Sequence, residues 1–130
     1  MAQKVMIVDD NPADREIISI VFKEMGRKEK LEFAQSGSDA LQLLQMSGDL
    51  PALILLDLKL PGISGIETLH QIRTDERLKH VPVVIVSGSD HPQARKEVLE
   101  AGADSYLYKS MDMDKFYRDI HSILQRFLKD

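Results

Sequence analysis

The chain has 130 residues, which suits one domain with its own hydrophobic core and leaves little room for a second. It contains no cysteine, which excludes disulfide bonds, thiolate metal sites and a thiol nucleophile. Its 17 basic and 21 acidic residues give a net charge of −4, which disfavours nucleic-acid binding, and no apolar stretch approaches the roughly 18 residues of a membrane span. The first residues also lack the apolar core of a signal peptide, so we expect a cytoplasmic protein.

Five short apolar runs along the chain are typical of β-strands. They lie at residues 5–8, 31–34, 53–56, 83–86 and 105–108. Apolar residues recur at the spacing of amphipathic helices within residues 17–25, 40–44, 66–72, 98–101 and 116–127. Asn11 and Pro12 are residue types preferred at the start of a helix, and Gly102 is the type preferred just after its end. The sequence therefore predicts a strand followed by a helix, five times.

This strict alternation with short connections predicts an α/β fold. We expect a (βα)5 arrangement, a doubly wound five-stranded parallel sheet with helices on both faces and right-handed crossovers. No repeat, low-complexity segment or linker divides the chain. We therefore expect a single domain over residues 1–130, with a core from about residue 4 to about residue 127 and no output domain.

Two runs of mixed charge lie between the predicted elements, at residues 27–30 and 75–80. Charged residues without apolar periodicity are typical of solvated connections. We expect both runs to be exposed connectors, and neither indicates a nucleic-acid site.

Chemically useful side chains follow four of the predicted strands. Asp9 and Asp10 follow the first strand, Asp57 the third, Ser87 the fourth and Lys109 the fifth. The carboxyl ends of parallel strands lie at one edge of a sheet, where ligands bind in open α/β folds. The sequence therefore predicts that three carboxylates, a hydroxyl group and an ammonium group meet at one rim.

These residue types indicate phosphoryl chemistry with a hard metal ion. Three neighbouring carboxylates repel one another unless a cation neutralises them, and oxygen ligands favour Mg²⁺, whereas zinc would want Cys or His ligands that these motifs lack. An aspartate can act as a nucleophile and form an aspartyl phosphate, and Asp57 is the best candidate. The metal ion, Lys109 and Ser87 would stabilise charge on the transferred phosphoryl group.

Four ordered blocks of the sequence resemble the receiver domains of two-component response regulators, the family of the chemotaxis regulators. The blocks are residues 8–11 (VDDN), 55–65 (LLDLKLPGISG), 84–88 (VIVSG) and 101–109 (AGADSYLYK). The similarity extends from about residue 4 to about residue 127. It implies the flavodoxin-like receiver fold with strand order 2-1-3-4-5, for which a member of this family is a known example.

The resemblance implies a phosphoryl-accepting signalling switch of a two-component phosphorelay. Asp57 would accept the phosphoryl group from a phosphohistidine on a sensor histidine kinase or a phosphotransfer protein. Asp10, Asp57 and the backbone carbonyl of Lys59 would bind Mg²⁺ directly, and Asp9 would act mostly through water. Lys109 would contact the phosphoryl oxygens.

Ser87 and Tyr106 would report phosphorylation, as the resemblance further implies. Ser87 would swing toward the phosphoryl group and Tyr106 would turn inward. This would change the face made by the fourth helix, fifth strand and fifth helix, and so the binding of a downstream protein. The protein would be a monomer or a weak homodimer through that face, with no nucleic-acid or membrane partner. It would not be an enzyme beyond accepting and losing its own phosphoryl group.

The sequence departs from the family at Ser110, where members usually have proline after a cis peptide bond. A cis bond before a residue other than proline costs about 2.5 to 4 kcal/mol, so either the bond is cis at that cost or the loop differs. A looser resemblance, in residues 11–14 and 77–82, connects the chain with stand-alone receivers, some of which serve phytochrome-type kinases.

Three other functions share part of this pattern. An unphosphorylated docking scaffold would keep the fold, but degenerate receivers tend to lose the acid pair or the lysine. An aspartyl-nucleophile phosphatase of the haloacid dehalogenase type would want a second acid two residues after Asp57, where the chain has Lys59. A flavin-binding protein of this topology would want a first loop rich in Ser, Thr and Gly, whereas residues 9–11 are acidic and would repel a phosphate.

Overall fold

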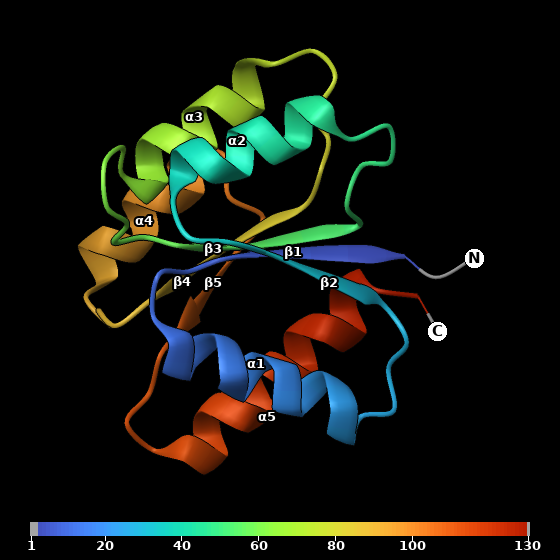
Figure 1. Ribbon diagram of the computed structural model, residues 1–130. Coiled ribbons are helices and arrows are strands. Elements are labelled where there is room, and N and C mark those ends of the chain that lie inside the picture. Colours follow the sequence, from blue (N-terminus) through green and yellow to red (C-terminus); the bar gives the residue numbers. More distant parts are fainter. Residues whose placement is uncertain (1–2, 130) are drawn as a thin grey trace.

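The structure, a computed structural model, describes residues 3–129, and strands and helices alternate in the predicted order (Figure 1). The strands are Lys4–Val8 (β1), Lys30–Ala34 (β2), Leu53–Asp57 (β3), Val83–Ser87 (β4) and Ser105–Tyr108 (β5). The helices are Pro12–Glu24 (α1), Gly37–Met46 (α2), Gly65–Thr74 (α3), Pro92–Glu100 (α4) and Met113–Phe127 (α5).

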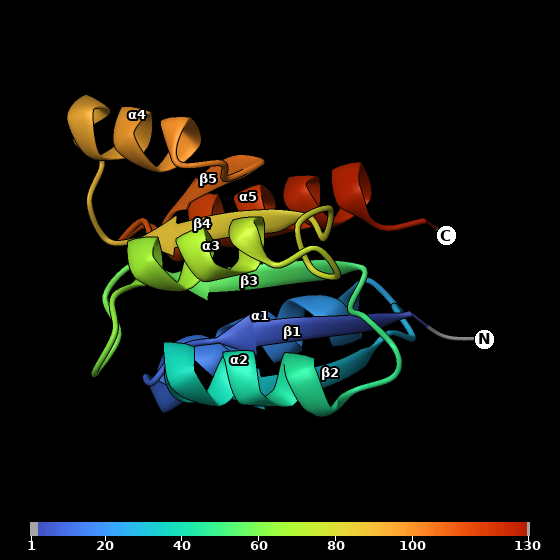
Figure 2. The same ribbon diagram turned by 90° about the horizontal axis from the view of Figure 1, so that it is seen from above.

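The five strands form one parallel sheet in the order β2-β1-β3-β4-β5, which confirms the predicted fold class and strand order. Helices α1 and α5 cover one face of the sheet, and α2, α3 and α4 cover the other (Figure 1). The strands run away from the side of the molecule where β1 begins and α5 ends (Figure 2). Their carboxyl ends therefore form the opposite edge of the sheet.

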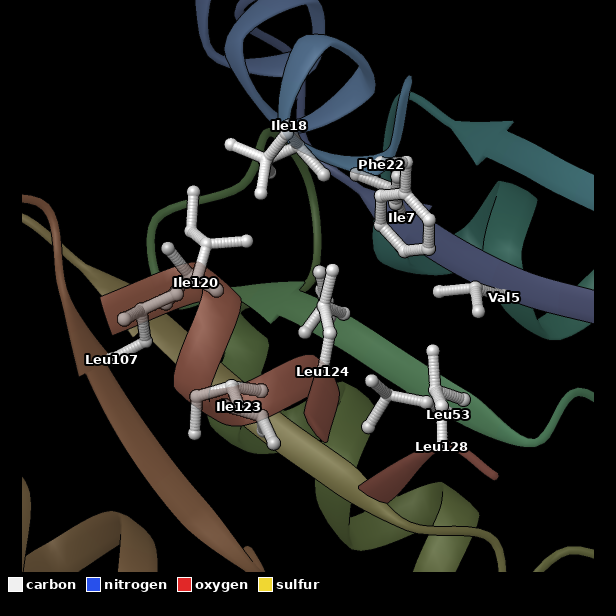
Figure 3. Packing of buried hydrophobic residues seen from close by; sticks show 14 of the residues in the cluster. Val5, Ile7, Ile18, Phe22, Leu53, Leu107, Ile120, Ile123, Leu124 and Leu128 are labelled. Atoms are coloured by element: carbon white, nitrogen blue, oxygen red, sulfur yellow. The ribbon is translucent and has the colours of Figure 1, made fainter. Parts of the chain in front are cut away.

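The sheet separates two hydrophobic layers, and the central strands supply side chains to both in strict alternation. Val5 and Ile7 of β1 pack with α1 and α5, together with Ile18 and Leu124 (Figure 3). Met6 of β1 belongs to the opposite layer, under α2, α3 and α4. Strands β3 and β4 are buried along their whole length, so residues at their carboxyl ends are held on a rigid base.

Helix ends follow the local signals in the sequence. The Asn11 side chain accepts hydrogen bonds from the backbone N–H groups of Ala13 and Asp14, and Pro12 occupies the first helical position of α1. Gly102 follows α4 with a φ of +110°, which a residue without a Cβ atom adopts readily. The start of α1 and the end of α4 are therefore confirmed.

Four of the strands, β1 to β4, are each one residue longer than the apolar runs predict, whereas β5 has the predicted bounds. Strands β1 and β2 each begin one residue earlier, and β3 and β4 include Asp57 and Ser87 as their last residues. The backbone goes on pairing past the last apolar side chain, because Asp57 is in register with Val86 and Ser87 with Tyr108. Asp57 and Ser87, which were predicted to follow strands, are therefore part of the sheet itself.

The expectation that both charged runs are solvated connectors is wrong in part. In the first run, Arg27 and Glu29 form an ion pair of 2.8 Å whose side chains are only 7% and 9% exposed. The paired charges satisfy each other, which lowers the cost of burying them. In the second run, Leu78 is fully buried and Arg77 donates a 2.7 Å hydrogen bond to the carbonyl of Leu44 in α2.

The Lys109–Ser110 peptide bond is trans, as are all peptide bonds of residues 3–129, so the loop differs from the family's usual cis geometry. No helix within this range combines the length and apolar character needed to cross a membrane.

Candidate phosphoacceptor and metal site

Three of the predicted acids lie together at the carboxyl edge of the sheet. Carboxylate oxygens of Asp9, Asp10 and Asp57 all lie within 4.8 Å of one another. Asp9 and Asp57 are buried, whereas Asp10 is exposed, so the group opens to solvent on one side. Carboxylates at this separation repel, and the burial of Asp9 and Asp57 limits the screening of their charges by water.

The Asp57 carboxylate stands at the end of a fully buried strand. Burial raises the pKa of Asp57, the Lys109 ammonium opposes that rise, and the neighbouring Asp9 adds to it. One Asp57 oxygen accepts a 3.1 Å bond from Lys109 Nζ, and the other accepts a 3.2 Å bond from the backbone N–H of Lys59. The structure therefore places the backbone of Lys59 beside Asp57, through its N–H group.

Lys109 connects the acids. Its Nζ atom donates hydrogen bonds to Asp9 Oδ2 at 3.1 Å, Asp57 Oδ2 at 3.1 Å and Asp14 Oδ2 at 2.8 Å. Burial works against the charged form, but the bond to Asp14 and the charges of Asp57 and Asp9 outweigh it and raise the pKa of Lys109. The ammonium is therefore charged at neutral pH.

Sequence reasoning missed Asp14. This residue lies in the first turn of α1 and is therefore not among the strand-end residues. A signal was present, because Asn11 and Pro12 fix where α1 starts and a helix that follows β1 directly must begin above the carboxyl edge.

Backbone contacts position the two buried acids. Asp9 Oδ1 accepts from the backbone N–H of Asn11 at 2.8 Å, and Arg15 donates to the Asp9 carbonyl at 2.9 Å. The start of α3 lies against the end of β3, because a Cβ atom on Gly65 would fall 2.5 Å from the Asp57 carbonyl oxygen and 2.8 Å from Leu58 Cα. Only glycine allows the two backbones to approach this closely.

Ser87 and Tyr106 lie on the side of the site toward α4. The Ser87 side chain is buried and its hydroxyl accepts a 3.1 Å bond from the backbone N–H of Ser89. The carbonyl of Ser89 in turn accepts a 2.5 Å bond from the hydroxyl of Tyr106, and the guanidinium of Arg95 in α4 lies 5.1 Å from the Tyr106 ring centroid. Hydrogen bonds therefore join the end of β4 to β5, next to α4.

The loop after β5 is held without a cis bond. The backbone N–H of Lys109 donates to the Ser87 carbonyl at 2.7 Å, which extends the pairing of β4 with β5. The Ser110 hydroxyl accepts from the backbone N–H of Asp112 at 3.1 Å, and Asp112 is the N-cap of α5. Ser110 thus contributes a turn bond that proline could not provide.

The residues at this edge fit a hard divalent cation. Three carboxylates within 4.8 Å of one another offer only oxygen ligands, and one of them is open to solvent, so water could complete the coordination. The ammonium group of Lys109, which contacts Asp9 and Asp57, offsets part of the repulsion among the acids.

This fold and this edge define a class of protein, the flavodoxin-like receiver domains. The response regulator receiver domain family matches residues 5–121, and the chain belongs to this family. It is therefore a receiver domain of a two-component system, a class whose members generally serve as signalling switches without enzymatic activity.

Individual relatives agree in length and in shape. The chemotaxis protein CheY of Pseudomonas aeruginosa is 34% identical over 123 residues, which cover 95% of this chain and 97% of CheY. The phosphorylated cyanobacterial phytochrome response regulator RcpA superposes with a TM-score of 0.91 at 28% identity, covering 99% of this chain and 96% of RcpA. The Mn²⁺-bound response regulator Rcp1 gives a TM-score of 0.88 at 29% identity, covering 98% and 95% of the two chains.

Proposed function

We propose that this receiver is a phosphoryl-accepting switch and that Asp57 is its phosphoacceptor. The observation that carries the proposal is the hydrogen bond between the buried Asp57 carboxylate and Lys109, inside a group of acids at the carboxyl edge of the sheet. This geometry supports Asp57 as a nucleophile at a site that opens to solvent beside Asp10. The ammonium of Lys109 is already in place to stabilise negative charge.

In the proposed reaction a carboxylate oxygen of Asp57 attacks the phosphorus of a phosphohistidine as the phosphorus–nitrogen bond breaks. The imidazole leaves with the bonding electrons, and the product is an aspartyl phosphate. The ammonium of Lys109, now 3.1 Å from Asp57 Oδ2, would donate to a phosphoryl oxygen. The hydroxyl of Ser87 would give up its bond from Ser89 and turn toward the same group.

The proposal includes Mg²⁺ as the cofactor. Asp10, Asp57 and the backbone carbonyl of Lys59 would hold the ion, with Asp9 acting through water. When bound, the ion would neutralise the charge that develops on the phosphoryl oxygens. The mutual approach of the three carboxylates and the Mn²⁺ bound by the relative Rcp1 support this assignment.

The proposed partners are a sensor histidine kinase or phosphotransfer protein as donor, and a downstream protein that reads the face formed by α4, β5 and α5. Tyr106 would couple the two, because its hydroxyl is bonded to the loop that follows Ser87. The proposed oligomeric state is a monomer or a weak homodimer through the same face, and the proposed location is the cytoplasm. The similarity to RcpA supports a phytochrome-type kinase as one donor class.

The proposal is tested by incubating the protein with acetyl phosphate and Mg²⁺ and measuring its intact mass. We expect a gain of one phosphoryl group that is absent in Asp57→Asn and absent when the metal is chelated. Asp39→Asn, which removes an exposed carboxylate from the first turn of α2, is the control and should be phosphorylated normally. A wild-type protein that stays unmodified would instead support the unphosphorylated docking scaffold. Phosphorylation that persists in Asp57→Asn would show that another residue is the phosphoacceptor.

A further inference from the structure

The ammonium of Lys109 uses its whole bonding capacity on carboxylates. An ammonium has three N–H donors, and Lys109 has three carboxylate partners, Asp9, Asp14 and Asp57. The bond to Asp14 is the shortest of the three, at 2.8 Å. Two of the partners, Asp9 and Asp57, belong to the group that could hold a metal ion, and Asp14 does not.

A divalent cation and this ammonium would engage the same carboxylates. A cation in the proposed site would engage Asp57 directly and Asp9 through water, and Lys109 now contacts both of these carboxylates. The two positive charges would repel each other beside two buried acids. Without another partner, Lys109 would either hinder the cation or leave the site. Asp14 can be that other partner, because it is not among the proposed metal ligands.

Asp14 is well placed to hold Lys109 because it stands on a fixed element. It occupies the third helical position of α1, and its own backbone N–H bonds to the Asn11 cap. Its side chain is 21% exposed and that of Lys109 is 17% exposed, so the pair is partly shielded from water. A charged bond in such surroundings is stronger than one on the open surface.

We propose that Asp14 is a positioning residue for Lys109. It keeps the ammonium at the rim when a divalent cation engages Asp9 and Asp57, so that the cation and the ammonium occupy the site together. The inference rests on the proposed metal site and adds to it a residue whose role is to make metal binding and lysine retention compatible.

The test is a double-mutant cycle on Mg²⁺ affinity, measured without any phosphoryl donor. Metal-free wild type, Asp14→Asn, Lys109→Met and the double variant are titrated with Mg²⁺, and the amide NMR signals of residues 9–14 and 57–59 are followed. We expect Asp14→Asn to weaken Mg²⁺ binding about fivefold or more when Lys109 is present and less than about twofold in the Lys109→Met background. Asp39→Asn, at the same helical position in α2, should leave the affinity unchanged.

An equal loss of affinity in both backgrounds, or no loss in either, would overturn the inference, because Asp14 would then act only as one more negative charge or not at all. A wild-type protein that does not bind Mg²⁺ would overturn both the inference and the metal part of the proposed function. The second readout is the side-chain NMR signal of Lys109 in the presence of saturating Mg²⁺. It should stay close to its metal-free position in wild type and move to that of a free lysine in Asp14→Asn.

Discussion

Asp57 illustrates how neighbouring residues offset the cost of one buried charge. Burial raises its pKa, the ammonium of Lys109 opposes that change, and the backbone N–H of Lys59 adds a hydrogen bond. Gly65 helps to fix the Asp57 backbone, because the absence of a side chain lets the first turn of α3 lie directly against it. A carboxylate held in this way keeps its orientation, which the proposed role of Asp57 as a nucleophile requires.

Gly65→Ala should therefore destabilise the protein and disturb the site. The new Cβ atom would meet the carbonyl of Asp57 and the Cα atom of Leu58, which are backbone atoms that move only with the strand. We expect a loss of about 1 to 3 kcal/mol in the free energy of unfolding by urea, as for other overpacked positions. Gly48→Ala is the matched control, since a Cβ atom there meets nothing within 4 Å, and it should change stability by less than about 0.5 kcal/mol. Equal effects of the two substitutions would contradict this account.

The site residues that could be predicted from the sequence are those on strand ends. Asp9, Asp57 and Lys109 follow from the argument that parallel strands share a carboxyl edge, and the structure brings them into contact. Asp14 was missed because it lies on a helix and not at a strand end, although it stands four residues before Ile18 and so shares the buried face of α1. Which residue of the carboxyl edge it contacts depends on how α1 packs on the sheet, which the local pattern does not contain.

At the scale of elements, periodicity located every strand and helix, while strand bounds depended on backbone pairing. A count of apolar residues stops before Asp57 and Ser87, but the hydrogen bonds of the sheet continue through them. The strand order could not be worked out from the pattern, because alternation of strands and helices is compatible with several orders, and it came from the resemblance alone. The ion pair between Arg27 and Glu29 could not be predicted either, because a run of charged residues has the same sequence pattern whether its side chains are exposed or buried in pairs.

Contacts between elements also give the fold a dependence on pH. The Gln45 side chain of α2 donates a 2.7 Å hydrogen bond to the carboxylate of Asp75 at the end of α3. The backbone N–H of Arg77 donates a second hydrogen bond to the same carboxylate, and the two bonds lower the pKa of Asp75. A carboxyl group with a lowered pKa in the folded state stabilises the fold at every pH above its unfolded pKa of about 3.9. That contribution is lost as the pH falls through the folded-state pKa.

Asp75→Asn should consequently reduce the free energy of unfolding at neutral pH, and the difference from wild type should shrink as the pH is lowered below about 4. Urea titrations at a series of pH values measure both quantities. Gln45→Ala removes the donor from the other side and should reproduce part of the same pH dependence. A difference that stays constant over the whole pH range would mean that the carboxylate's charge plays no part.

At the scale of the whole molecule, the carboxyl edge and the face formed by α4, β5 and α5 are joined by a short path. Ser87 ends β4 in the site, Ser89 follows in the next loop, and the carbonyl of Ser89 accepts a bond from Tyr106 of β5. Arg95 of α4 lies over the ring of the same tyrosine. A change in the rotamer of Ser87 would release the N–H of Ser89 and so reach β5 and α4 through two hydrogen bonds.

Tyr106→Phe tests this path, because it removes the hydroxyl and keeps the ring that packs in the core. Amide NMR spectra are recorded with Mg²⁺ before and after addition of beryllium fluoride, a mimic of the phosphoryl group. We expect the changes around Asp57 to persist in Tyr106→Phe and those in α4 and α5 to shrink by at least about half, with stability lowered by about 1 kcal/mol for the lost bond. Tyr108→Phe, two residues further along β5, is the control and should behave as wild type. If α4 and α5 respond to the mimic as fully in Tyr106→Phe as in wild type, the hydroxyl of Tyr106 does not carry the signal.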